Sequence, residues 1–204
     1  VTGLAQGVTR LEGPGPSLNC EVFSTGKPVN LTHMSLFDKK KMLNWFVACI
    51  EANSFLDIDG FYFIYQENWY YESKYTGLMA AIALGFNDFA RTLIHYDANF
   101  NLRDKWGSTS LVRAALVGNT NMVGILLDLG ALVNAADYLG YMALHAAASA
   151  GHVDTVRLLL ERGADINARG TVLYGNRAAT QNALDLASTH EQKDVVALLQ
   201  GWGR

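Results

Sequence analysis

Three landmarks of this sequence recur at one fixed interval, and that interval constrains the fold more than any other feature. Segments that begin at Thr76, Thr109 and Met142 share one hexapeptide pattern and start 33 residues apart each time. Glycines and asparagines recur at the same spacing, namely Gly85, Gly118 and Gly151, and Asn101, Asn134 and Asn167. Three landmarks that keep one interval over about a hundred residues predict an internal repeat.

The repeated unit resembles the ankyrin repeat, whose family has a period of about 33 residues and a Thr-Pro-Leu-His-x-Ala signature. The third unit is closest to that pattern, with ALHAA at 143–147, GHVDTVRLLL at 151–160 and GADINA at 163–168. A fourth unit starts at Asn182, 40 residues after the third, because seven extra residues lie before it. None of the four units has the proline, one has the histidine, and Glu191 stands where the others have glycine.

This resemblance implies an all-α ankyrin-repeat solenoid of helix-turn-helix-loop units, with an irregular, aromatic-rich N-terminal extension. We expect the ankyrin-repeat domain to span residues 72–204 as four repeats. Their approximate bounds are 72–104, 105–137, 138–170 and 171–204, with an insertion in the loop before the last repeat. Small residues recur in the first helix of each unit and large aliphatic residues in the second, as expected where neighbouring repeats pack closely.

Two segments precede the repeats. Residues 1–37 are predicted to form an extended arm, because all three prolines lie there and helical periodicity is lacking. Either a disordered tail or an arm that becomes ordered along a partner fits this composition. Residues 38–71 are predicted to be a helical capping segment or a degenerate first repeat, with a helix at 38–52. The nine aromatic residues within 55–75 either cap the first repeat or anchor a partner.

The charge balance argues against nucleic-acid binding. The net charge is −3, and the region from residue 76 carries ten basic and eleven acidic residues, so it lacks a phosphate-neutralising surface. No apolar run has the length of a transmembrane segment, so we expect membrane association only through a partner complex. Cys20 and Cys49 do not indicate a disulfide framework, which favours an intracellular and by default cytoplasmic protein. Because the chain starts at Val1, a processed organellar protein is the alternative.

The candidate reactive residues do not converge on a catalytic or metal site. The five histidines include no pair at metal-ligand spacing, and neither a phosphate-binding glycine loop nor a nucleophile elbow is present. His145 matches the histidine of the family signature, which secures a turn by hydrogen bonding in that family. We therefore expect no enzymatic activity, no catalytic residue, no metal and no cofactor.

The resemblance implies binding of one or more protein partners through the loop tips and the exposed sides of the first helices. The loops 101–107 and 134–140 each have an aspartate three residues before a glycine, a pattern typical of tight turns. Trp106 and Tyr138 are therefore predicted to be exposed at the tips. Aromatic rings would supply affinity, and arginines would supply orientation. The predicted partner-binding residues are Tyr75, Arg103, Lys105, Trp106, Arg113, Tyr138, Tyr141, Tyr174 and Arg177.

Two alternatives stay open from the sequence. The chain is either such an interaction module or a permanent structural subunit of a large complex, for example an organellar or membrane-associated one. In the second case its N-terminal arm and aromatic segment would be the anchor. The loop 169–181, which carries the insertion, is either a tolerated surface insertion or a specific contact arm.

Overall fold

The computed structural model describes most of the chain from residue 73 onward and a few positions before it. The described residues are 29–30, 41, 44, 48, 59, 62–65, 73–174 and 177–202. Contacts divide the chain into two compact units, Val1–Gly77 and Leu78–Arg204. The arm expected at 1–37 and the capping segment expected at 38–71 lie almost wholly outside the described residues, and both stay predictions.

The first unit contains a small β-sheet that the repeat period did not indicate. Strand β1 (Val29–Asn30) pairs in parallel with β2 (Tyr62–Tyr65), and β2 pairs antiparallel with β3 (Ser73–Thr76). Strand β2 lies in the aromatic-rich stretch, and aromatic side chains favour extended structure. The three described positions within 38–52 are helical, in agreement with the helix predicted there.

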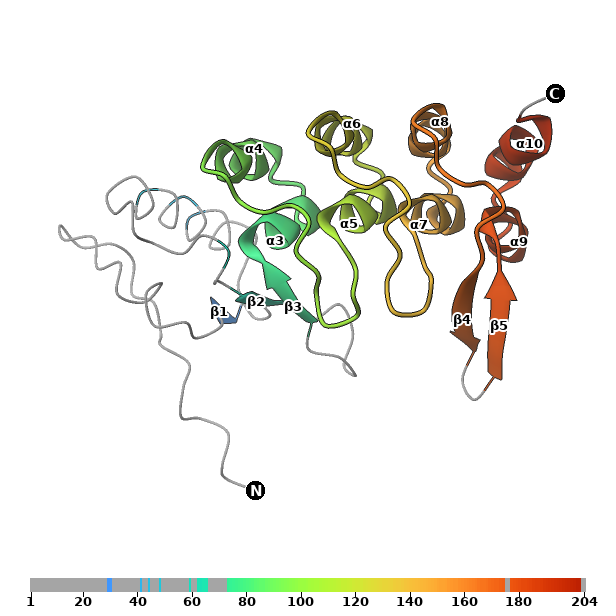
Figure 1. Cartoon of the computed structure of the whole chain (residues 1–204), viewed down its shortest axis with the longest axis horizontal. Helices are drawn as coiled ribbons and strands as arrows, with labels where there is room; N and C mark the ends of the chain where they lie inside the picture. Colours follow the sequence, from blue (N-terminus) through green and yellow to red (C-terminus); the bar gives the residue numbers. More distant parts are fainter. Residues whose placement is uncertain are drawn as a thin grey trace, which may run out of the picture. The chain divides into compact units, whose positions relative to one another are not determined.

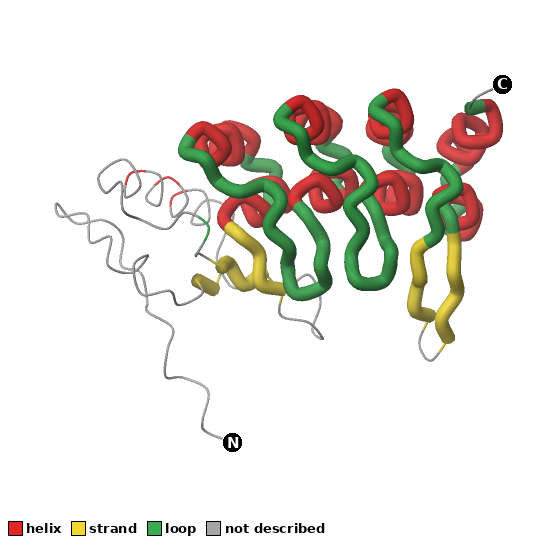
Figure 2. The backbone as a smooth tube through the Cα atoms, viewed as in Figure 1, coloured by secondary structure: helices red, strands yellow, loops and turns green. Residues whose placement is uncertain are grey.

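The second unit consists of four helical pairs (Figure 1). The first helices of the pairs are α3 (Gly77–Ala83), α5 (Ser110–Leu116), α7 (Ala143–Ala150) and α9 (Ala183–Thr189). The second helices are α4 (Asn87–His95), α6 (Thr120–Asp128), α8 (Val153–Glu161) and α10 (Lys193–Gly201). Figure 2 shows the first helices in one layer and the second helices in another, with the connecting loops projecting beyond the first layer. This arrangement confirms the predicted all-α solenoid.

Alanines allow the first helices to pack closely. Helix α5 contacts α7, and α7 contacts α9. The fully buried alanines of these helices include Ala114, Ala115, Ala147, Ala148 and Ala187. Larger side chains fill the core on the second helices, among them Leu93, Leu126 and Leu159. Because larger side chains in the first helices would push neighbouring repeats apart, the close packing explains why small residues recur there.

The turn between the two helices of a pair requires a residue in the left-handed conformation. Gly85, Gly118 and Gly151 have φ values of +73°, +68° and +81° at this position. In the fourth pair the residue is Glu191, with φ +58°. A residue with a Cβ atom is disfavoured in this conformation by roughly 1–2 kcal/mol. The departure from glycine seen in the sequence therefore places backbone strain in the last repeat.

We predict that Glu191→Gly raises the free energy of unfolding of the full chain by about 0.5–1 kcal/mol, which urea unfolding would measure. The gain is smaller than the strain itself because glycine has more conformational freedom to lose on folding. Gly118→Ala is the matched control. The alanine would have to adopt a φ of +68°, and its Cβ would lie 2.5 Å from Nδ1 of His152, so stability should fall. A less stable Glu191→Gly variant would contradict the assignment of strain to this turn.

The insertion before the last repeat forms a β-hairpin. Strand β4 (Gly170–Tyr174) pairs antiparallel with β5 (Arg177–Gln181), from the pair Gly170↔Gln181 to the pair Tyr174↔Arg177. The hairpin projects on the same side as the other loops (Figure 1). We expected only a protruding loop here, although a Gly-Asn dipeptide between two short segments is typical of a two-residue hairpin.

The hairpin contacts the preceding loop backbone to backbone. The N–H of Thr171 donates a hydrogen bond of 2.7 Å to the carbonyl oxygen of Leu139. A Cβ atom on Gly170 would lie 3.0 Å from the carbonyl oxygen of Gly140 and 3.2 Å from Cα of Tyr141. Only a glycine at position 170 lets the hairpin and the preceding loop approach this closely without a shift of the backbone.

We predict that Gly170→Ala destabilises the protein by roughly 1–3 kcal/mol, because the added methyl group would meet backbone atoms that cannot rotate away. Gly124→Ala, in the interior of α6, is the control, since its Cβ would meet only Cδ2 of Leu158, at 3.8 Å. That variant should gain up to about 1 kcal/mol from its better helix propensity. Urea unfolding curves of both variants test the prediction, and an unchanged midpoint for Gly170→Ala would refute it.

Candidate functional site

One aspartate organises each of the two projecting loops. Before α5, Oδ1 of Asp104 accepts hydrogen bonds from the N–H groups of Trp106 (2.8 Å) and Ser108 (2.9 Å). Before α7, Oδ1 of Asp137 accepts two bonds of 2.9 and 2.8 Å from the residues at the equivalent positions. The glycine of each turn has a φ near +80°, at +81° and +80°. The tight turns predicted from the Asp-x-x-Gly spacing are therefore confirmed, and they hold the loop tips in fixed positions.

The tips carry an exposed aromatic patch, which we call the fingertip surface and define as Lys105, Trp106, Tyr138 and Leu139. Trp106 is 41% exposed and Tyr138 is 73% exposed. The N–H of Tyr138 donates to the carbonyl oxygen of Trp106 (3.0 Å), and its ring packs on Gly107, where a Cβ would lie 2.8 Å from Cδ1. The ammonium group of Lys105 lies 5.2 Å from the centroid of the Trp106 ring. The predicted exposure of both rings is confirmed, and the two loops present them as one surface.

Both arginines predicted for this region contact the protein's own loops. Nη1 of Arg103 donates to the carbonyl oxygens of Gly107 (2.7 Å) and Ala136 (2.6 Å), so its exposed side chain bridges two successive loops. Nη2 of Arg113 donates to Oδ2 of Asp104 at 2.9 Å. Only 11% of the Arg113 side chain is exposed, and the Asp104 carboxylate is fully buried. Arg113 is therefore a structural partner of its loop and offers a small surface to another protein.

Tyr141 lies two residues before α7, at the end of the loop, and is half-buried. Its hydroxyl group lies 2.9 Å from Oγ of Ser149. Its ring stacks on that of His145, with centroids 5.5 Å apart. Three other predicted residues have side chains outside the described part of the chain: Tyr75 in β3, and Tyr174 and Arg177 in the hairpin.

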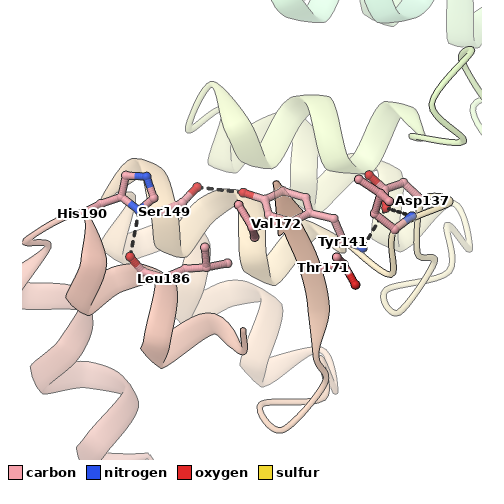
Figure 3. A pocket seen from close by; sticks show the side chains of 8 residues that line it. Asp137, Tyr141, Ser149, Thr171, Val172, Leu186 and His190 are labelled. Carbon is pink, nitrogen blue, oxygen red and sulfur yellow. Dashed lines mark hydrogen bonds between the residues drawn. The ribbon is translucent and has the colours of Figure 1, made fainter. Parts of the chain in front are cut away.

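Beside Tyr141 lies a pocket of about 300 Å³, which we call the inter-repeat pocket (Figure 3). It is lined by Asp137, Leu139 and Tyr141 of the loop, Ser149 of α7, Thr171 and Val172 of β4, and Leu186 and His190 of the last helical pair. Of these residues, only Tyr141 is among the partner-binding residues predicted from the sequence. The others come from four parts of the chain: the loop, α7, β4 and the last helical pair. Only Asp137 had a signal in the sequence, because an aspartate stands three residues before a glycine in both loops.

His145 has a structural role. Its Nδ1 accepts a hydrogen bond from the N–H of Met142 (3.1 Å), so its Nε2 is the protonated nitrogen and donates to the carbonyl oxygen of Ala168 (3.0 Å). Burial lowers the pKa of His145 below its ordinary value of 6.5, because the charged imidazolium would lose its hydration. The expectation that this histidine secures a turn by hydrogen bonding is confirmed.

We predict that His145 makes the stability of the protein depend on pH. Because its folded-state pKa lies below 6.5, the unfolded chain binds the proton first as the pH falls. The stabilising contribution of neutral His145 is therefore complete above pH 6.5 and is lost as the pH falls through the lower, folded-state pKa. Urea unfolding at pH 7.5, 6.5 and 5.5 should show a smaller loss of stability for His145→Gln than for the parent chain. Exposed His95 provides the control, and equal slopes for His145→Gln and His95→Gln would contradict the prediction.

The described residues contain neither a metal-binding cluster nor a membrane-spanning helix. No group of three or more His, Cys, Asp or Glu side chains there could hold a metal ion. None of the helices in that part of the chain is long and apolar enough to cross a membrane.

Comparisons with known proteins agree with the architecture. A family model described as ankyrin repeats in three copies matches residues 68–170, and a second ankyrin-repeat model matches residues 144–200. A search of curated proteins found no match.

Proposed function

The chain belongs to the ankyrin-repeat family, and on that premise we propose that it is a non-catalytic interaction module whose protein partner binds the loop tips and the exposed sides of the first helices. Ankyrin repeats are generally protein–protein interaction modules and are typically non-catalytic. The family supports a protein as the ligand, while the position of the binding surface rests on the properties of this chain.

The fingertip surface is the observation that carries the proposal. Trp106 and Tyr138 come from successive loops and stay substantially exposed, although large aromatic side chains are usually buried. Leu139, which is 41% exposed, extends the apolar area. Aromatic residues of this kind are common anchors of protein interfaces, because they bury much surface with few rotatable bonds. Contiguous exposed apolar patches likewise mark interaction sites.

Hydrogen bonds within the protein hold the loops in place, which favours binding. The carboxylate of Asp104 and the Arg103 bridge to Ala136 hold the loop backbones in place. A partner would then immobilise few groups that are not already fixed, so less of the interaction energy is lost to conformational entropy. Lys105 stands next to the Trp106 ring and would favour an acidic or carbonyl group at the edge of the interface.

We predict that a photo-reactive benzoylphenylalanine at position 106 of the full chain cross-links to the partner in cells of the source organism. The matched control position is Leu132, which is 70% exposed and apolar but lies between α6 and the next projecting loop. Mass spectrometry of the cross-linked species would identify the partner. Equal cross-linking at both positions would indicate non-specific contact and contradict a fingertip interface.

With the partner identified, Trp106→Ala and Tyr138→Ala should each lower affinity by at least about 10-fold, because truncating an aromatic anchor costs roughly 2 kcal/mol. Leu132→Ala should leave Kd nearly unchanged, and titration calorimetry measures all three. If removal of residues 1–36 abolishes binding while both aromatic variants bind normally, the fingertip proposal is wrong. That result would favour the permanent structural subunit.

A further inference from the structure

The aspartate carboxylates of the two successive loops differ in what their second oxygen atom, Oδ2, binds. Asp104 and Asp137 are 33 residues apart and use Oδ1 in the same way, for two backbone N–H groups. Oδ2 of Asp104 binds the guanidinium group of Arg113 at 2.9 Å. The residue 33 positions after Arg113 is Ala146, which cannot supply a cation. Among the described residues, none donates a hydrogen bond to Oδ2 of Asp137.

Asp137 is also one wall of the inter-repeat pocket. Figure 3 shows the Tyr141 side chain running from the loop beside Asp137 toward Ser149, with Val172 next to it. A volume of about 300 Å³ has room for one long side chain and lies at the lower limit of small-molecule sites. The pocket is therefore suited to a single residue inserted from another protein.

The chemistry of the pocket walls favours a cation on a long apolar stem. Among the described lining residues, Asp137 is the only one with a formal charge when histidine is neutral, so an anionic group would be repelled. Tyr141 adds an aromatic ring to the lining, and aromatic rings attract ammonium and guanidinium groups. Leu139, Val172 and Leu186 are apolar, as suits the methylene groups of such a side chain.

We propose that the inter-repeat pocket receives an arginine side chain of the partner protein, whose guanidinium group binds Asp137 as that of Arg113 binds Asp104. A guanidinium is favoured over an ammonium because its planar set of donors matches a carboxylate and also stacks on aromatic rings. Leu139 belongs to both the pocket and the fingertip surface, so one partner can occupy both. This inference rests on the proposed function, since it assigns one partner residue to the same face.

The test begins with peptides selected from a random twelve-residue display library on the full chain. Selected peptides should share one arginine, and its replacement by citrulline, which has nearly the same shape without the charge, should raise Kd roughly 5- to 10-fold. Asp137→Asn keeps the Oδ1 acceptor of the turn and removes the charge. In this variant the arginine and citrulline peptides should bind equally. Asp154→Asn, an exposed site in the first turn of α8, makes the same change in net charge and should preserve the preference.

A second variant supplies the cation from within the protein. Ala146→Arg would place a guanidinium group at the position of Arg113 in the preceding repeat, so the arginine peptide should lose its advantage over citrulline. Ala146 is fully buried, and if the variant does not fold, Asp137→Asn alone decides the question.

The outcomes separate this inference from the proposed function. Peptides that lose binding in Trp106→Ala but show no arginine preference, or keep it in Asp137→Asn, would leave the fingertip surface intact and overturn the arginine site. A chain that selects no peptide and forms no specific cross-link at position 106 would overturn both.

Discussion

The close packing of successive first helices is the constraint on which the rest of the solenoid depends. Alanines such as Ala114 and Ala147, with no exposed surface, let α5, α7 and α9 approach one another. This spacing brings each loop within hydrogen-bonding distance of the next. The N–H of Tyr138 can then reach Trp106, and the N–H of Thr171 can reach Leu139. The fingertip surface is thus a direct result of how the core packs, because a larger residue in these helices would separate the loops as well.

The features that distinguish this chain arise where its repeats differ from one another. The aspartate turn is the same in both loops, but the charge of the carboxylate is balanced differently. Arg113 pairs with Asp104, whereas alanine stands at the equivalent position, Ala146, in the repeat of Asp137. Helix turns that contain glycine are relaxed, whereas the one at Glu191 is strained. A repeat architecture provides equivalent positions, and substitution at one of them changes the local chemistry without changing the fold.

The β4–β5 hairpin, which carries the insertion, forms part of the inter-repeat pocket. Strand β4 lies against the loop before α7, where Gly140 and Gly170 permit contact between the backbones. Thr171 and Val172 thereby form a wall of the inter-repeat pocket. The insertion changes the surface while the helical layers continue unchanged into the last repeat (Figure 2).

The sequence by itself determined the repeat period, the helical pairs, the tight turns at Asp104 and Asp137, and the exposure of Trp106 and Tyr138. These features depend on residues close together in the chain, whose spacing and turn chemistry can be read directly. Only the tertiary structure decided that Arg113 neutralises Asp104, that residues 170–181 pair as strands against the preceding loop, and that eight residues surround a pocket. The pocket brings together residues that are far apart in the sequence, from Asp137 to His190. Their meeting depends on the stacking of whole repeats, which no local pattern encodes.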